Sequence, residues 1–201
     1  MTVRLTLMAP AARAGREVRF AVDEPPDEAG LRAARAAAGT LPHPDRAVCG
    51  PSARCRETAR ALGLRPAGET APADWDMGRW RGRDLAEVGA AEPEAVARWL
   101  ADPSAAPHGG ESLSGFRARV GGWLDSLPPT AGRLVAVVEP AVARAALVHA
   151  LGLPEQTFWR LDIAPLTATR LTSRAPGRWN LRCGSPLSAP DPGADQSAGP
   201  G

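Results

Sequence analysis

The chain has 201 residues and a formal net charge of +2, from 24 positive side chains, all of them arginine, and 22 negative ones. This length allows one domain with a substantial core. Arginines and acids are interspersed, so no basic stripe points to nucleic acid, and no apolar run is long enough to span a membrane. The three cysteines lack the spacing of zinc ligands, and no secretory segment is recognised. We therefore expect a cytoplasmic protein, monomeric or homodimeric, without nucleic-acid or membrane partners.

The first half of the chain alternates short apolar runs with helical stretches. The segment VRLTLM predicts a strand at 3–8, and a helix at 25–41 follows, opening with prolines and acids and continuing with alanines. A short strand at 47–49 and a helix at 53–64 come next. A looser region at 74–82, rich in Trp and Gly, separates this half from the second.

The second half continues the alternation, with helices predicted at 92–100, 108–127 and 142–153 and strands at 134–138, 168–171 and 179–182. Ser112 is the expected N-cap of the second of these helices. Residues 184–201 are rich in Pro, Gly and Ser and are expected to be disordered, so the folded domain is predicted to span 1–183. The pattern as a whole predicts an α/β fold with three layers, αβα, around a mostly parallel central sheet.

Four segments carry motifs, in the order GPSARCRETA at 50–59, DWDMGRWRG at 74–82, GGES at 109–112 with Arg119, and VVEPAVARAALVHALGLP at 137–154. Together they resemble the histidine phosphatase superfamily, whose members have the phosphoglycerate mutase-like fold. In the first motif Arg54 matches the family pattern, and in the second Asp74 stands in the place of a glutamate. The resemblance covers most of the predicted domain and implies the same fold here.

Two segments on which the family's chemistry depends are altered. In active members the first strand ends in Arg-His-Gly, and that histidine attacks phosphorus; a second histidine, followed by two glycines, helps to hold the phosphoryl group. Here residues 9–11 read Ala-Pro-Ala and residues 139–141 read Glu-Pro-Ala, so Pro10 and Glu139 stand in the two histidine places. Arg144, five residues after Glu139, fixes this alignment. Because proline offers no nucleophile, the resemblance implies a divergent member without catalytic residues.

The residues left at the predicted site favour ligand binding over phosphoryl transfer. Arg54, Asp74 and Glu139 are expected to converge at the carboxyl ends of the first and late strands, and Arg13 could swing in to replace the arginine missing at position 9. Two carboxylates facing one arginine would repel a phosphate dianion. Arg54 is equally compatible with a structural anchor that pairs with either carboxylate. We expect no cofactor and no metal, since two carboxylates without histidine are a weak ligand set.

Two main functions remain open from the sequence. The first is a catalytically degenerate histidine-phosphatase-like protein, a pseudophosphatase, that binds a small molecule such as a cation, an amine or a zwitterion, or that acts as a regulator. The alternative is an enzyme of changed chemistry, in which the Asp74 and Glu139 carboxylates serve as acid and base in the ancestral cleft. Residual phosphatase activity is a third candidate. The sequence does not indicate which ligand is bound.

The other side chains that could take part in chemistry are expected to have structural roles. This applies to the three histidines of the chain, His43, His108 and His149. Trp75 and Trp80 could line a pocket or pack in the core, and both alternatives stay open.

Overall fold

The computed structural model describes residues 2–13, 15, 19–41, 43–175 and 177–183, and the structural statements below refer to these residues. The segment 184–201, for which disorder is predicted, lies outside them. Within the described ranges, no helix combines the length and the apolar character that a bilayer span requires.

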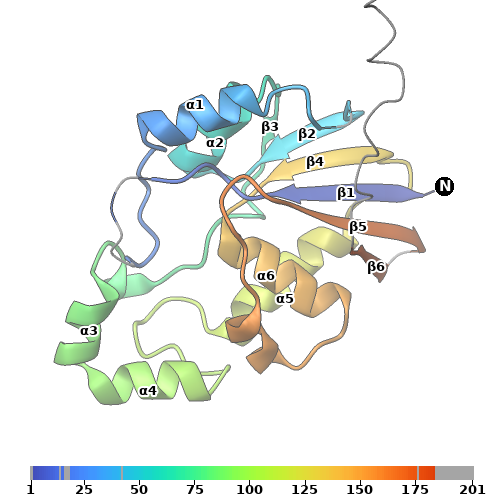
Figure 1. Ribbon diagram of the computed structural model, residues 1–201. Helices are drawn as coiled ribbons and strands as arrows, with labels where there is room; N and C mark the ends of the chain where they lie inside the picture. Colours follow the sequence, from blue (N-terminus) through green and yellow to red (C-terminus); the bar gives the residue numbers. More distant parts are fainter. Residues whose placement is uncertain (1, 14, 16–18, 42, 176, 184–201) are drawn as a thin grey trace, which may run out of the picture.

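Six strands of the described chain form one mixed sheet in the order β3-β2-β4-β1-β5-β6 (Figure 1). Their bounds are β1 Val3–Met8, β2 Arg46–Cys49, β3 Ala67–Gly68, β4 Arg133–Val137, β5 Ala168–Ala175 and β6 Arg178–Arg182. The pairs β1–β4, β2–β4 and β2–β3 are parallel, whereas β1–β5 and β5–β6 are antiparallel. The predicted α/β class with a mostly parallel sheet is confirmed.

Helices cover both faces of the sheet, which gives the three predicted layers (Figure 1). Helices α1 (Glu28–Ala36) and α2 (Ala53–Ala61) pack together on one face, and α5 (Leu113–Asp125) and α6 (Pro140–Ala150) pack together on the other. Because both faces are covered, the central strands need apolar side chains on both sides. Strand β1 buries Val3, Leu5 and Leu7 in the core on one face and Met8 in the core on the other, each at 5% exposure or less, and four of the five residues of β4 are buried.

Helices α3 (Leu85–Ala91) and α4 (Pro93–Ala101) extend the molecule beyond the carboxyl ends of the parallel strands (Figure 1). The sequence reasoning missed α3, although Asp84 caps it by accepting a hydrogen bond from the N–H of Ala86 at 2.7 Å. Helix α3 ends before Pro93, because a residue that precedes proline avoids the helical conformation. The two-residue strand β3 and the 3-10 helix η2 (Glu155–Arg160) were also not predicted.

Several predicted helices are shorter in the structure. The helix expected at 25–41 spans only Glu28–Ala36, because Asp27 caps its start and the chain turns through Gly39 at a φ of +82° after its end. The helix expected at 108–127 begins at Leu113, with Ser112 as the predicted N-cap accepting from the N–H of Gly115 at 3.1 Å. Gly109, at a φ of +78°, keeps the preceding segment out of the helix.

Helices α5 and α6 approach each other closely at Gly121. A Cβ atom at this position would lie 2.3 Å from Nδ1 of His149, whereas a Cβ at the neighbouring Gly122 would meet nothing within 4 Å. His149 in turn contacts α5, since its Nε2 lies 2.9 Å from Oδ2 of Asp125. The close spacing of the two helices therefore requires a residue without a side chain at Gly121 but not at Gly122.

Alanine substitutions at these two glycines should have opposite effects. Gly122→Ala should stabilise the protein by about 0.5–1 kcal/mol, because alanine favours the helix and the position is open. Gly121→Ala should destabilise it by about 1–3 kcal/mol, because the new methyl group displaces the ring of His149 from Asp125. Urea unfolding of both variants measures the difference. Equal stabilisation of the two would show that the helices tolerate a side chain at this contact.

Candidate functional site

The segment Ala9-Pro10-Ala11 follows β1 and is buried, with Ala9 at 1% and Ala11 at 0% exposure. Its backbone is bonded within the protein: the N–H of Ala11 donates to Oγ1 of Thr58 at 3.0 Å, and the carbonyl of Pro10 accepts from the N–H of Leu166 at 3.4 Å. None of the three residues lines the cleft described next. The end of the first strand therefore offers no reactive side chain and no free N–H from Ala11.

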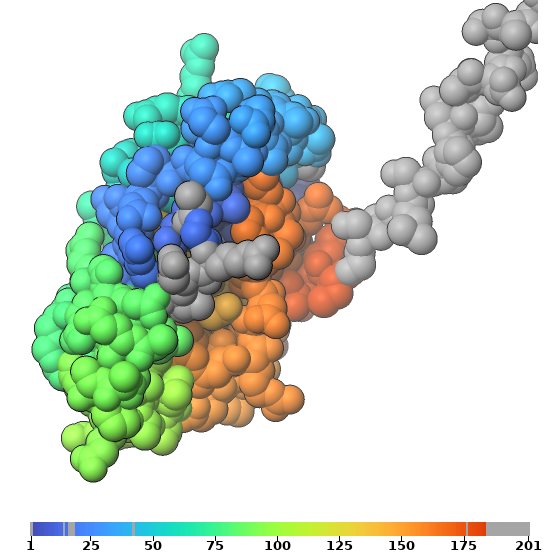
Figure 2. Space-filling model, turned by 60° about the vertical axis from the view of Figure 1, so that its left-hand side comes forward, coloured from blue at the N-terminus to red at the C-terminus, as the bar shows by residue number. Residues whose placement is uncertain are grey.

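The cleft has two parts that share several lining residues. One part, of about 610 Å³, is lined among others by Ser52, Asp76 and Glu111, and the other, of about 550 Å³, by arginines and aromatic rings. Asp74 and Glu139 line both parts. Figure 2 shows the face on which the three bordering regions meet: the N-terminal segment in blue, the α3–α4 region in green and the α6–η2 segment in orange.

Glu139 is the N-cap residue of α6 and lies two residues after the end of β4. Its carboxylate accepts two hydrogen bonds from the guanidinium of Arg54, one of them 3.3 Å from Nε, and one from the hydroxyl of Ser52 at 2.8 Å. The side chains of Glu139 and Arg54 are only 8% and 18% exposed. An internal carboxylate thus occupies two donors of Arg54, as expected for the structural anchor that was one of its two predicted roles.

The N-terminus of α2 supplies the other groups around this carboxylate. Ser52 caps the helix by accepting from the N–H of Cys55 at 3.1 Å while its hydroxyl binds Glu139. The Sγ atom of Cys55 lies 3.7 Å from Oε1 of Glu139. Burial, and then the negative charge of Glu139, raise the pKa of the Cys55 thiol far above its usual range, so this thiol stays protonated and is no nucleophile.

Asp74 lies on the loop between β3 and η1 (Gly78–Trp80), partly buried. Burial, followed by the charge of Glu139, raises its pKa to about 7. A hydrogen bond from the N–H of Trp75 and the positive charges of Arg54 and Arg119 act in the opposite direction. The carboxyl of Asp74 therefore keeps its proton to a higher pH than an exposed aspartate does.

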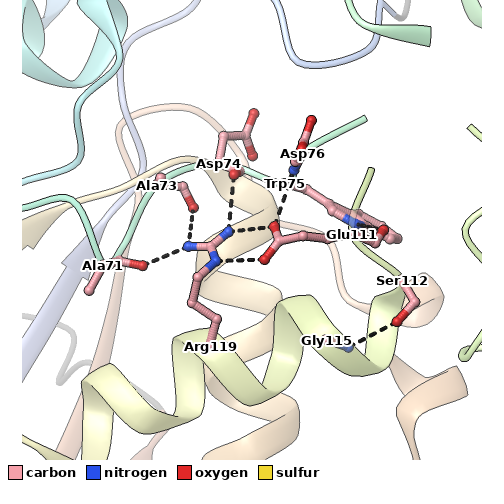
Figure 3. A network of polar contacts seen from close by, with 9 residues as sticks. All are labelled: Ala71, Ala73, Asp74, Trp75, Asp76, Glu111, Ser112, Gly115 and Arg119. Atoms are coloured by element: carbon pink, nitrogen blue, oxygen red, sulfur yellow. Dashed lines mark hydrogen bonds and ion pairs between the residues drawn. The ribbon is translucent and has the colours of Figure 1, made fainter. Parts of the chain in front are cut away.

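Arg119, on α5, fastens the loop that carries Asp74 (Figure 3). It forms two hydrogen bonds of 2.7 Å with the carboxylate of Glu111 and donates to three backbone carbonyls of the loop. The sequence motifs include Glu111 and Arg119 but do not indicate this contact between them. The available signal was a glutamate just before the helix and an arginine within it, eight residues further along the chain.

The predicted site residues are brought together in part. Arg54 and Glu139 are in direct contact, and both act electrostatically on Asp74. Of the two carboxylates that were considered as partners of Arg54, Glu139 is the one its guanidinium binds. Arg13 lines the second part of the cleft, and its Nη1 lies 3.6 Å from the carboxylate of Glu24. Sequence reasoning missed Ser52, whose N-cap position before α2 was the signal.

The histidines stand apart from the cleft. None of the three lines either part of it. His108 is buried, its Nδ1 accepts from the N–H of Gly110 at 3.1 Å, and burial lowers its pKa, which keeps the ring neutral. Among the residues that the structure describes, no group of three or more His, Cys, Asp or Glu side chains is placed to hold a metal ion.

The two tryptophans of the looser region differ in position. Trp80 is fully buried and belongs to the core. Trp75 is 5% exposed, lines both parts of the cleft and stacks on Phe116 with ring centroids 5.3 Å apart and planes at 2°. Core packing therefore describes Trp80, whereas Trp75 serves both as core and as pocket wall.

The sequence profile of the histidine phosphatase superfamily (branch 1) matches residues 10–184. The chain therefore belongs to this superfamily, and its fold is the predicted phosphoglycerate mutase-like one. A bifunctional protein of Mycobacterium tuberculosis is 37% identical over 101 residues, which cover 47% of this chain. The match spans only 28% of the length of that relative.

Solved structures resemble nearly the whole described chain. A mycobacterial hydrolase ("hydrolase 2") is 27% identical with a TM-score of 0.77, and the match covers 90% of both chains. A mycobacterial glucosyl-3-phosphoglycerate phosphatase in complex with inorganic phosphate is 26% identical with a TM-score of 0.73, and the match covers 90% of this chain and 95% of that one.

The raised pKa of Asp74 predicts a pH-dependent stability. A carboxyl group whose pKa is raised on folding stabilises the folded state fully when the pH is below the pKa of the unfolded chain, near 4. This stabilisation is lost as the pH rises to the pKa of the folded state, about 7. Asp74→Asn removes the effect. Relative to the wild type, the free energy of unfolding of the variant should rise between pH 4 and pH 8 by at most about 4 kcal/mol, because each pKa unit corresponds to roughly 1.4 kcal/mol.

Urea unfolding at several pH values tests this expectation. Asp102→Asn is the control, because hydrogen bonds from Ser104 lower the pKa of Asp102 below its ordinary value. Its replacement should therefore leave the pH dependence between pH 4 and pH 8 nearly unchanged and act in the opposite direction only below about pH 4. A constant difference between Asp74→Asn and the wild type from pH 4 to pH 8 would contradict the assignment.

Proposed function

We propose that this chain is a pseudophosphatase of the histidine phosphatase superfamily, which binds a small cationic or zwitterionic molecule in its cleft. The observation that carries the proposal is the ion pair of Arg54 with Glu139, because it engages the arginine that would otherwise hold a phosphoryl group. Pro10 stands in the place of the nucleophile and is buried away from the cleft. Loss of a nucleophile alone costs on the order of 10⁶ in kcat.

The charges that line the larger part of the cleft support this proposal. Carboxylates outnumber arginines there: Asp23, Asp74, Asp76, Glu111 and Glu139 against Arg81 and Arg119. An excess of negative charge gathers cations and repels phosphate dianions. In the second part the balance is reversed, since Arg13, Arg19, Arg54 and Arg144 line it against Asp74 and Glu139. Together with the rings of Trp99 and Trp159, these arginines favour a zwitterionic ligand that has an apolar portion and an anionic group beside its cationic one.

We also propose that the protein works in the cytoplasm, as a monomer or a homodimer. All three cysteines are free, two of them buried, which fits a reducing compartment.

One observation favours a second candidate, an enzyme of changed chemistry. A carboxylic acid with a pKa of about 7 is suited to exchange protons at neutral pH, and Asp74 has this property. Glu139, bound to Arg54 and Ser52, would then act by its charge and not as a base. In this alternative Asp74 alone is the acid–base group, in place of the carboxylate pair that the sequence suggested.

The proposal predicts that the protein does not hydrolyse phosphomonoesters. With p-nitrophenyl phosphate the wild type should release no product above the buffer rate, and Pro10→His should not change this, because Glu139 still engages Arg54. The triple variant Ala9→Arg/Pro10→His/Glu139→His restores the arginine and both histidines of the family pattern, though not its glycines, and shows whether these three side chains are enough for turnover in this assay. Turnover by the wild type that disappears in Arg54→Gln would overturn the proposal.

Ligand preference gives an independent measurement. In thermal unfolding, 1,4-diaminobutane should raise the midpoint of the wild type and inorganic phosphate should not, because binding to the folded state stabilises it. Glu139→Gln frees the guanidinium of Arg54, so the phosphate effect should appear and the diamine should bind about tenfold more weakly, as expected for one lost charged contact. Tight phosphate binding by the wild type would contradict the proposed preference.

A further inference from the structure

The loop that carries Asp74 is stabilised mainly by a side chain and not by its own backbone. Between β3 and η1 the chain has no helix or strand, and its internal backbone bonds are few, such as that from the N–H of Ala73 to the carbonyl of Thr70 at 3.1 Å. Backbone carbonyls away from water need a partner. The carbonyls of Ala71, Ala73 and Asp74 all accept hydrogen bonds from the guanidinium of Arg119.

Every N–H group of Arg119 is used within the protein (Figure 3). A guanidinium has five N–H donors, and Arg119 makes five hydrogen bonds: 2.7 Å and 3.2 Å to the carbonyls of Ala71 and Ala73, 3.2 Å to that of Asp74, and two of 2.7 Å to Glu111. Arg119 lines the cleft, yet it has no donor left for a ligand. Its place in the cleft therefore needs an explanation other than ligand binding.

Glu111 fastens the other side of the same loop. Its carboxylate accepts from the N–H of Asp76 at 3.3 Å, and its backbone carbonyl accepts from the indole N–H of Trp75 at 2.8 Å. The two segments also touch backbone to backbone, because a Cβ atom at Gly110 would lie 2.1 Å from the carbonyl oxygen of Asp76. The carboxylate of Glu111 and the guanidinium of Arg119 thus hold the loop from both sides of Asp74.

We propose that Arg119 is a positioning residue, which together with Glu111 holds the Asp74 carboxyl in the cleft beside the Arg54–Glu139 pair. The inference rests on the proposed function in so far as Asp74 serves the cleft. Since Glu111 neutralises the charge of Arg119, the effect of the arginine on Asp74 is mainly one of position. The charged groups that act on Asp74 from neighbouring elements are Glu139 on α6, Arg54 on α2 and Arg119 on α5.

Titration of the Asp74 carboxyl, followed by carbon-13 NMR in the full-length protein, distinguishes position from charge. If Arg119 acted only by its charge, Arg119→Gln would raise the pKa of Asp74. If it holds the loop, release of the loop admits water to the carboxyl, and the pKa should fall from about 7 by at least one unit, because burial is the main cause of its elevation. An unchanged or higher pKa in Arg119→Gln overturns the proposal.

Two further variants complete the experiment. Arg117→Gln is the matched control, since Arg117 lies on the same helix, is similarly exposed and forms one ion pair of 2.7 Å with Glu155; it should leave the Asp74 titration unchanged. Arg119→Lys keeps the charge but cannot supply five donors in one plane, so it should also lower the pKa of Asp74. Arg119→Lys replaces Arg119→Gln in the experiment if the glutamine variant does not fold. An Asp74 titration in Arg119→Lys like that of the wild type would contradict the proposal.

The Asp74 titration and the phosphatase assay can fail separately. Hydrolysis of phosphomonoesters by the wild type would refute the pseudophosphatase, while the titration of Asp74 would still report on Arg119. Conversely, an inactive protein whose Asp74 titration ignores Arg119 would retain the proposed function and lose the positioning role.

Discussion

The Arg54–Glu139 ion pair joins the amino ends of two helices in the wall of the cleft. Helix α2 contributes Arg54 and its N-cap Ser52, and α6 contributes its N-cap Glu139. Because the pair is largely buried, removing either partner would leave a charge without compensation, which is far more costly than losing an exposed pair. The relative position of the amino ends of α2 and α6 therefore depends on this contact and on the neighbouring bond from Ser52 to Glu139.

The same contact determines what the remaining acid can do. Glu139 remains a neighbouring negative charge for Asp74 even though Arg54 is bound to it, and this charge adds to the effect of burial on Asp74. The loop of Asp74 cannot relax away from Glu139, because α5 holds it through Arg119. A proton on Asp74 is thus the means by which the cleft relieves the repulsion between two acids in a partly dry site.

The sequence predicted the fold better than the site, for physical reasons. The apolar runs of β1 and β4 and the family motifs were enough for the sheet and its layers, since burial on both faces leaves a strong pattern. Helix α3 was missed because it is short and is followed at once by the proline of α4. The convergence of Arg54 with Glu139 followed from motif positions. The five bonds of Arg119 did not, because they depend on where loop carbonyls lie in space.

The position of Trp75 has an optical consequence. The chain contains no tyrosine, so its near-ultraviolet emission comes almost entirely from six tryptophans, of which Trp75 alone lines both parts of the cleft. Its ring is stacked on Phe116 and its indole N–H is bound to the carbonyl of Glu111, so its orientation is fixed. Fluorescence from this indole responds to the charge and polarity of what lies beside it. The cleft therefore contains its own reporter, and ligand occupancy becomes visible without an added label.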